Sequence, residues 1–393
     1  MLTERGWAVA GAGVALATLW YLFGETELGV AALLALGALT GSILVLGGKR
    51  PYLQVTRRTS PAGIHEGSHA SVMLRLQNRG GTLRHISVSD EVEGLGTAEF
   101  AAATFASGSE LHAVYRVLCR PRGIYTIGPA SVTLRDPLGL SSRSHRAGRA
   151  DTLVVYPRVE DLSGLPGSPG QNLSVDSSRP RHGQRGGEDF YTLREYQQGD
   201  DFRRIHWPSS ARVDRLMIRQ LETPWQSRSL VLFDVRAGSY TDGEAFELAV
   251  SGAASVTRHL MDHSFDSELW TGGPTVSVSA RGRGYAVAME RLARVQPEDR
   301  VDLSAVAAGL RNRGGGGMLI LVTGRPDEDL LGLTRVLGAE YPTAVLLATR
   351  GGPYLPAFQG AGVTTVTPES ERSWSSAWSD AMRTSWHSAS VGS

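Results

Sequence analysis

Asp234 lies at a position in the sequence where a ligand could bind. It ends the apolar run Ser229-Leu-Val-Leu-Phe-Asp, which predicts a buried strand. Open parallel sheets bind ligands beyond the carboxyl ends of their strands, and hard cations take oxygen ligands. An Asp-x-Ser-x-Ser cation site would need hydroxyl groups where this chain has Arg236 and Gly238. Because a guanidinium opposes a divalent ion, Asp234 is only a weak metal candidate, and the competing interpretation is that it caps the following helix or pairs with Arg236.

His206 is the side chain that could serve as a catalytic base. Glu195, Asp200 and Asp201 lie close to it in the sequence. A histidine with such neighbours is more often held in an ion-pair network, where its role is structural. The sequence contains neither a Gly-x-Ser-x-Gly elbow nor a His-Glu-x-x-His helix. We therefore expect a protein that is not an enzyme and holds no cofactor, with a hydrolase using His206 as an alternative.

Residues 186–222 form the most informative block of the chain. They contain six arginines and seven carboxylates around five large aromatic residues. Exposed rings gain nothing from water, so this mixture predicts a folded surface on which arginines fork onto carboxylates or stack on rings. The block serves either as a clamp that locks a connector onto the next domain or as a docking surface for a partner protein, and the two roles are compatible.

Composition narrows the class of protein. The chain has 393 residues, and its Lys+Arg 40 and Asp+Glu 39 leave a net charge of +1. This balance disfavours nucleic-acid binding as the main activity. Cys119 is the single cysteine, so it forms no internal disulfide, and this favours a reducing compartment for the soluble part.

The N-terminus predicts a transmembrane hairpin. The runs 7–23 and 28–46 are apolar and uncharged, and each approaches the roughly 20 residues that cross a bilayer as a helix. A signal peptide ending near Phe23 is the alternative, but a second apolar run follows at once. Basic residues flank the two outer ends, and glutamates occupy the turn: Arg5, Lys49, Arg50, Arg57 and Arg58 against Glu25 and Glu27. This bias predicts a two-pass protein of the inner membrane with its soluble domains in the cytoplasm.

The remaining sequence predicts a β-sandwich, a connector and an α/β domain. Half-buried strands are expected at 70–78, 85–90, 111–118, 130–135 and 152–156. After the charged block, apolar runs at 229–234, 267–270, 318–324, 343–349 and 362–366 alternate with helical patterns at 246–261, 284–295 and around Trp374 and Trp378. Such alternation is typical of a doubly wound parallel sheet. The expected fold class is multidomain α+β, with a transmembrane helical hairpin (1–50), a β-sandwich (51–160), a flexible connector (161–187), the charged and aromatic segment (188–228) and a doubly wound α/β domain (229–393).

Two motifs carry a resemblance to a known family. The charged block resembles the signature of the domain-of-unknown-function 58 family of bacterial proteins in the runs Phe190-Tyr-Thr-Leu-Arg-Glu-Tyr-Gln-Gln-Gly-Asp-Asp-Phe-Arg-Arg-Ile-His-Trp-Pro-Ser-Ser-Ala-Arg and Leu216-Met-Ile-Arg-Gln-Leu-Glu. Upstream, Arg122-Gly-Ile-Tyr-Thr-Ile-Gly-Pro and Asp136-Pro-Leu-Gly-Leu resemble the family's β-domain motif. The chain departs from the family pattern at His206, where an aspartate is usual, and at Pro208, where a lysine is more common.

The resemblance implies a membrane-anchored protein with a β-sandwich and a von Willebrand A-like α/β domain. It also implies partners, because relatives are encoded beside MoxR-type AAA+ ATPases and transglutaminase-like membrane proteins. We expect a non-enzymatic scaffold or adaptor that acts with such an ATPase in assembly or maturation of other proteins. Its key surface or clamp would comprise Arg194, Tyr196, Gly199, Asp200, Arg203, Trp207, Ala211 and Arg212. The alternative is a cation-dependent adhesion module of the von Willebrand A type that uses Asp234.

Overall fold

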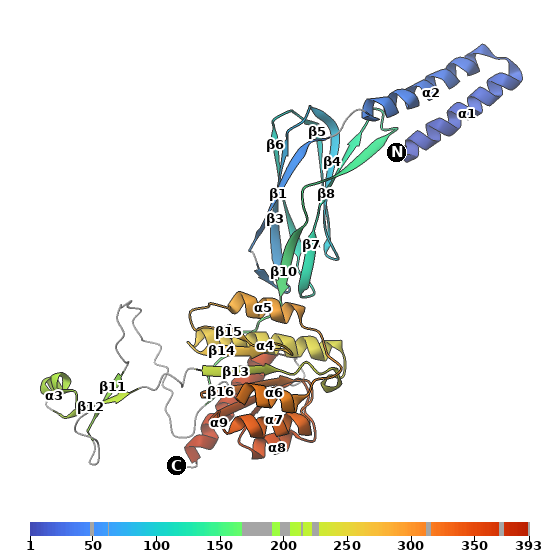
Figure 1. The fold of residues 1–393 in the computed structure, drawn as a ribbon. Coiled ribbons are helices and arrows are strands. Elements are labelled where there is room, and N and C mark those ends of the chain that lie inside the picture. Colours follow the sequence, from blue (N-terminus) through green and yellow to red (C-terminus); the bar gives the residue numbers. More distant parts are fainter. Residues whose placement is uncertain are drawn as a thin grey trace. The chain divides into compact units, whose positions relative to one another are not determined.

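The computed structural model describes residues 1–47, 51–61, 63–166, 191–196, 205–213, 215–221, 228–311, 316–368 and 373–391. The chain forms two compact units. The first comprises Met1–Arg158 with Met289–Arg294, and the second comprises Val159–Ala288 with Val295–Ser393. Each unit is described by itself below. The multidomain α+β layout expected from the sequence is present, with two apolar helices, a β-rich region and a mixed α/β region (Figure 1).

The first unit begins with a helical hairpin, α1 (Glu4–Phe23) and α2 (Thr26–Gly47). The reversal occurs at Gly24, whose φ of 73° is readily adopted by glycine and whose N–H donates to the carbonyl of Trp20. The two helices pack closely, since a Cβ added at Gly29 would lie 2.9 Å from the ring of Trp20. Both helices are long and apolar enough to cross a membrane, so they could form a membrane anchor.

Two facing sheets follow the hairpin. One has the strand order β1-β3-β6; the other has the order β2-β10-β7-β4-β8-β9, with β5 paired to β4. The strands are β1 (Leu53–Ser60), β2 (Gly63–His65), β3 (His69–Asn78), β4 (Leu83–Val92), β5 (Gly96–Phe105), β6 (Glu110–Leu118), β7 (Gly123–Ile127), β8 (Ala130–Arg135), β9 (Ser142–Ala147) and β10 (Asp151–Tyr156). Alternate residues of β3 are buried, and Leu74 packs with Ile86 and Val132 of the other sheet. The five strands expected in this region are present.

A buried ion pair crosses this β-rich core. Arg57 of β1 donates from Nε and Nη2 to both carboxylate oxygens of Asp90 on β4, at 2.7–3.1 Å. The two side chains are 2% and 0% exposed. Tyr115 of β6 donates its hydroxyl to Asp90 Oδ2 at 2.7 Å, and burial, followed by Asp90, raises the pKa of this phenol far above its usual value. The three groups connect the two sheets through one carboxylate.

The second unit contains a six-stranded sheet of order β15-β14-β13-β16-β17-β18, parallel except for the edge strand β15. Its strands are β13 (Arg228–Phe233), β14 (Asp266–Trp270), β15 (Val276–Val278), β16 (Met318–Thr323), β17 (Thr343–Ala348) and β18 (Thr364–Val366). Its helices are η3 (Ala237–Ser239), α4 (Gly243–Asp262), α6 (Leu303–Arg311), α7 (Glu328–Gly338), α8 (Leu355–Gly360) and α9 (Trp374–Val391); α5 (Tyr285–Arg294) is divided between the two units. All six residues of β16 are buried, as expected for a parallel strand covered on both faces.

The chain order across this sheet reverses next to β13. From β13 the chain moves outward through β14 and β15, and it then returns to place β16 on the other side of β13. The position between β13 and β16 is therefore a topological switch point, where open sheets bind ligands beyond the carboxyl ends of their strands. Asp234 and Thr323 stand at those two strand ends.

Residues 159–166 lie against α4 and α9. Glu160 Oε2 accepts hydrogen bonds from the backbone N–H groups of Trp374 and Ser375, at 2.9 and 3.2 Å, and so caps α9. Trp378 and Trp374 are fully buried, and Trp378 Nε1 donates to the carbonyl of Gly164 at 3.0 Å. The connector expected over 161–187 is thus packed as far as residue 166, because burying these indoles offsets the cost of ordering it. Residues 167–187 of that segment lie outside the described residues.

His259 of α4 contacts the same segment, and we expect it to make this attachment sensitive to pH. Its Nε2 lies 2.8 Å from the Gly164 carbonyl, and burial lowers the pKa of the ring to about 4, against a weaker opposing effect of that hydrogen bond. The unfolded chain therefore binds the proton more readily, and stability present above pH 6.5 should fall by up to about 3 kcal/mol as the pH drops toward 4. Chemical unfolding measured from pH 7 to pH 4 checks this. A His259→Gln variant keeps a donor without titrating and should show a shallower loss; an equal loss would contradict the assignment.

Candidate functional site

Asp234 is fully buried at the switch point and accepts hydrogen bonds with both carboxylate oxygens. Arg236 donates from Nε to Oδ1 and from Nη2 to Oδ2, each at 2.9 Å. The hydroxyls of Ser239 and Thr323 each donate to Oδ2 at 2.8 Å, and the Arg236 N–H donates to Oδ1 at 3.1 Å. Tyr240 also donates its hydroxyl to the Asp234 carbonyl. The carboxylate is therefore saturated by groups of the chain itself.

The guanidinium of Arg236 joins Asp234 to a second carboxylate. Its Nη1 and Nη2 donate to Asp327 at 2.9 and 3.1 Å, and Asp327 caps α7 by accepting from the N–H of Leu330 at 2.9 Å. Asp329 lies 3.7 Å from Nη1 at the exposed rim. Burial lowers the pKa of Arg236, but the two carboxylates outweigh it and hold this pKa above its usual value. Arg236 is thus a permanent cation between two acids.

This geometry decides between the interpretations of Asp234. The carboxylate pairs with Arg236, as the competing interpretation states. It does not cap the next helix, because Asp242 does so by accepting from the Ala245 N–H at 2.8 Å. Among the described residues, no group of three or more His, Cys, Asp or Glu side chains is arranged to hold a metal ion.

The sequence motif misses Ser239, which supplies the hydroxyl that Gly238 lacks. The motif would place this hydroxyl at position 238, four residues after Asp234. The helical turn Ala237–Ser239 bends the chain so that Ser239, five residues after Asp234, contacts the carboxylate instead. Thr323 is likewise identified only by the adjacency of β13 and β16. The sequence offers one signal for Thr323, which is its position as the last residue of a buried strand.

The described part of the charged block forms a small element of its own. Strand β11 (Tyr191–Glu195) pairs antiparallel with β12 (Met217–Leu221), and α3 (Trp207–Val213) lies between them in the sequence. Ile205 and Ile218 form a bridge and are buried. Ser210 Oγ accepts from the Met217 N–H at 2.8 Å, which ties the helix to the strand. We call β11, α3 and β12 the signature element.

His206 caps α3. It stands at the position where the related motif has an aspartate. The N–H of Ser209 donates to His206 Nδ1 at 3.3 Å, and the Ser209 hydroxyl lies 2.7 Å from the same nitrogen. Nδ1 accepts from this backbone N–H. A nitrogen that accepts from the first turn of a helix performs the capping role of a carboxylate. This contact favours a structural role for His206 over that of a general base.

Replacing His206 should test this capping role. His206→Ala removes the acceptor and should cost α3 about 0.5–2 kcal/mol, while His206→Asp should preserve the helix. Hydrogen exchange of the α3 amides in the full-length protein measures the difference. Equal protection in the wild type and in His206→Ala would contradict the cap.

The structure places the expected surface residues as follows. Arg194 lies opposite Ile218 in the strand pair, and the Tyr196 N–H donates to the Leu216 carbonyl at 2.8 Å. Trp207 begins α3 and is 65% exposed. Ala211 and Arg212 are also exposed on α3. Gly199, Asp200 and Arg203 lie outside the described residues.

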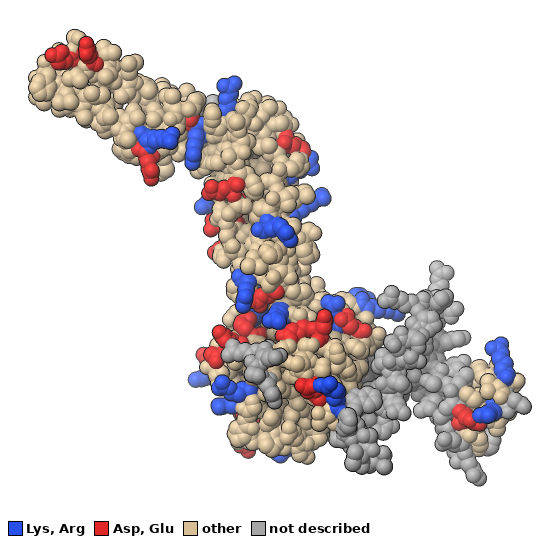
Figure 2. All heavy atoms as spheres, turned by 180° about the vertical axis from the view of Figure 1, so that it is seen from behind, with Lys and Arg blue, Asp and Glu red and all other residues tan. Residues whose placement is uncertain are grey.

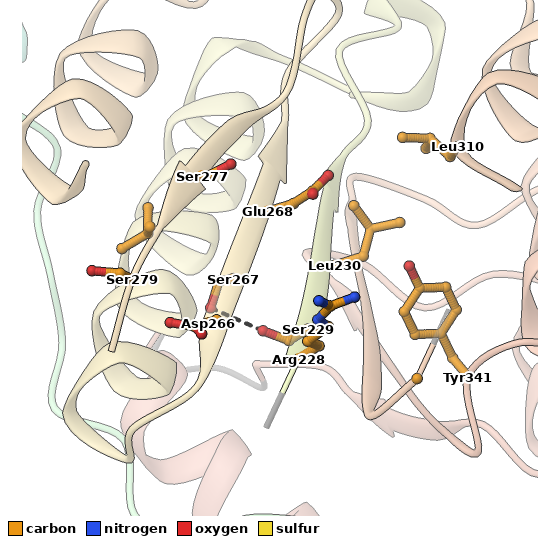
Figure 3. A pocket seen from close by; sticks show the side chains of 12 residues that line it. Arg228, Ser229, Leu230, Asp266, Ser267, Glu268, Ser277, Ser279, Leu310 and Tyr341 are labelled. Carbon is orange, nitrogen blue, oxygen red and sulfur yellow. Dashed lines mark hydrogen bonds between the residues drawn. The ribbon is translucent and has the colours of Figure 1, made fainter. Parts of the chain in front are cut away.

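A cavity of about 470 Å³ opens at the amino ends of β13 and β14, at the opposite end of these strands from Asp234 (Figure 3). Arg228, Glu268 and Tyr341 line it, and the Ser229 hydroxyl donates to Ser267 Oγ at 2.9 Å. Burial, followed by Glu268, raises the pKa of Tyr341, so this phenol stays protonated. The cavity is separate from Asp234, which stands at the carboxyl edge.

Comparison with known proteins finds one family model that matches part of the chain, and it names no activity. Residues 192–341 match the family model described as "Protein of unknown function DUF58". A Bacillus subtilis protein, "Uncharacterized protein YeaD", is 33% identical over 147 residues, which are 37% of this chain and 35% of that protein. The chain thus spans about a third of the length of this curated relative.

Two solved structures show distant likenesses to parts of this chain. A CARDB domain from Pyrococcus furiosus, in complex with di-metal ions, is 13% identical, with 27% of this chain and 88% of that chain covered and a TM-score of 0.21. The sporulation control protein Spo0M from Bacillus subtilis is 13% identical, with 26% and 49% covered and a TM-score of 0.16. Likenesses this low carry no argument about function.

Proposed function

We propose, from the match of residues 192–341 to the DUF58 family model, that this chain is a membrane-tethered, non-enzymatic scaffold. It would act with a MoxR-type AAA+ ATPase, and with a transglutaminase-like membrane protein, in assembly or maturation of other proteins. The α1–α2 hairpin would anchor it in the inner membrane with its soluble domains in the cytoplasm. The signature element would bind the ATPase.

The observation that carries the docking role is the exposure of apolar side chains on the signature element. Trp207 is 65% exposed, Val213 is 55% exposed and Leu216 is 39% exposed. Arg212 lies on the same short helix and is exposed. Tryptophan and arginine are the anchors most enriched at protein interfaces, because a partner that covers them buries a large ring and satisfies a planar cation.

A von Willebrand A-like assignment of the α/β domain is supported by its topology. Numbered within the domain, the strand order is 3-2-1-4-5-6, and strand 3 is the antiparallel edge. Asp234 ends the first strand at the switch point, where a cation-dependent module would hold its metal. In this chain the guanidinium of Arg236 lies between Asp234 and Asp327. This geometry favours a metal-independent scaffold over the cation-dependent adhesion module.

Co-purification of the full-length protein with a MoxR-type ATPase of the same organism tests the proposal. Trp207→Ala should reduce recovery of the ATPase. Trp7→Ala is the matched control, because Trp7 is 67% exposed but lies on α1. Equal recovery with the wild type and Trp207→Ala, or no recovery with either in any nucleotide state, would reject the docking role.

A further inference from the structure

The turn between β8 and β9 and the start of β9 contact the two outer ends of the helical hairpin. At the start of α1, the Thr3 hydroxyl and N–H donate to the carbonyls of Gly139 and Leu140, at 2.6 and 3.0 Å. At the end of α2, Arg143 Nη1 donates to the Gly47 carbonyl at 3.0 Å. Gly6 fits closely, since a Cβ there would lie 2.0 Å from the Leu140 carbonyl oxygen. The turn is therefore fixed at the base of the hairpin.

The internal hydrogen bonds of this turn present one apolar side chain outward. Asp136 is buried and accepts from the N–H groups of Leu138 and Ser141, at 2.9 and 2.6 Å. Gly139 has a φ of 69°, a conformation that glycine adopts readily. Leu138 is left 60% exposed, although a leucine at a fixed turn gains nothing from contact with water.

Charge is distributed unequally between the two ends of the hairpin. Three exposed arginines lie near the turn: Arg135 ends β8, Arg84 is at the start of the neighbouring strand β4, and Arg5 precedes Gly6 of α1. The far end of the hairpin carries Glu25 and Glu27, and Figure 2 shows acidic groups there. Where the hairpin meets the sheets, Figure 2 shows basic groups together with an acidic one, and exposed Glu4 lies beside Arg5 in the first turn of α1. Trp7, one turn into α1, is 67% exposed, as is common for rings in the headgroup region.

We propose that the β8–β9 turn is a membrane-interfacial element that binds anionic phospholipid. Leu138 lies at the boundary between the acyl chains and the headgroups, and Arg5 and Arg135 contact lipid phosphates. The bilayer is the occupant indicated by the structure, because the exposed leucine is continuous with two helices long enough to span it. This inference rests on the proposed membrane anchor and adds that the first β-rich domain is held on the bilayer surface.

The single cysteine makes a direct test feasible. Cys119 is fully buried, so a Cys119→Ser background allows one introduced cysteine to carry an environment-sensitive fluorophore. Leu138→Cys is the test position and Val114→Cys is the matched control, since these side chains are 60% and 59% exposed. Leu34→Cys, in the middle of α2 and 69% exposed, reports the anchor itself. Full-length protein is reconstituted in phosphatidylcholine vesicles with or without phosphatidylglycerol, and each vesicle type carries a lipid-borne quencher.

The proposal expects blue-shifted, lipid-quenched emission from position 138 and unquenched emission from position 114. Arg135→Glu should reduce quenching at 138 in the phosphatidylglycerol vesicles, and inorganic phosphate should not compete. If the probe at position 34 is quenched and the probe at position 138 is not, the inference is overturned but the membrane anchor is retained. A probe at 138 that is shielded but not quenched would show a protein contact instead of lipid, which also overturns it. Loss of quenching at both positions would reject the anchor.

Discussion

Replacing Arg236 by alanine should lower the free energy of unfolding of the α/β domain by about 3–5 kcal/mol, as for other buried charges that lose their partner. Asp234 is fully buried and receives two of its hydrogen bonds from this guanidinium. Thr323 and Ser239 would remain, but neutral hydroxyls do not compensate a buried negative charge. Chemical unfolding of the full-length protein in detergent, followed by a probe in this domain, measures the loss.

The matched control removes an ion pair that is exposed. Arg258 and Asp262 pair at 2.8 Å on α4, with side chains 45% and 47% exposed. Arg258→Ala should therefore cost only about 0–1 kcal/mol. Equal losses from Arg236→Ala and Arg258→Ala would show that Arg236 does not neutralise Asp234 in the folded domain.

A second variant tests whether the Arg236 guanidinium occupies the position that a bound metal ion would take. In Arg236→Ser, the oxygens of Asp234, Ser239, Thr323 and Asp327 remain around the vacated position. Millimolar Mg²⁺ or Mn²⁺ should then restore part of the lost stability, because hard cations bind oxygen ligands. The wild type should respond neither to these ions nor to a chelator, and a wild type destabilised by the chelator would contradict the account.

Asp90→Ala should have a comparable effect on the β-rich domain, about 3–5 kcal/mol. The substitution leaves Arg57, whose side chain is 2% exposed, without its main carboxylate, and it also removes the acceptor of the Tyr115 hydroxyl. The remaining carboxylate near Arg57 belongs to Asp151, which is half exposed and 3.3 Å away. Thermal unfolding monitored by hydrogen exchange in β1, β4 and β6 measures the effect.

The control for this prediction lies on the same three-stranded sheet. Arg75 and Glu110 form a bidentate salt bridge on the outer face of this sheet, with side chains 54% and 29% exposed. Arg75→Ala should cost no more than about 1 kcal/mol, since exposed pairs contribute little. If Asp90→Ala were as mild as Arg75→Ala, the buried network would not hold the sheets together.

The buried network also explains why the sequence did not reveal β1. Strand β1 was not predicted, because one of its inward positions is Arg57 rather than an apolar residue. Strands with regular apolar alternation, such as β3, were predicted closely. The doubly wound domain was equally predictable, since β16 and β17 are continuous apolar runs. Periodicity identifies a strand only where its buried face is apolar.

The candidate site was predictable in part. The acidic end of β13 and the opposition of Arg236 to a cation follow from residue types and from strand position. The roles of Ser239 and His206 do not, because each depends on a turn that places a side chain against one particular atom. Asp327 was predictable in part. The sequence shows that it follows β16 closely, but its contact with Arg236 depends on the pairing of β13 with β16.

Photo-crosslinking from α3 in native membranes shows whether the signature element contacts the ATPase. A photoreactive residue is placed at Ala211, which is exposed beside Trp207, and in a control at Val114 of the β-rich domain. We expect a crosslink from position 211 to the MoxR-type ATPase that persists in a chelator, and none from position 114. No crosslink from 211, a crosslink equally strong from 114, or one abolished by the chelator would contradict a metal-independent docking role for the signature element.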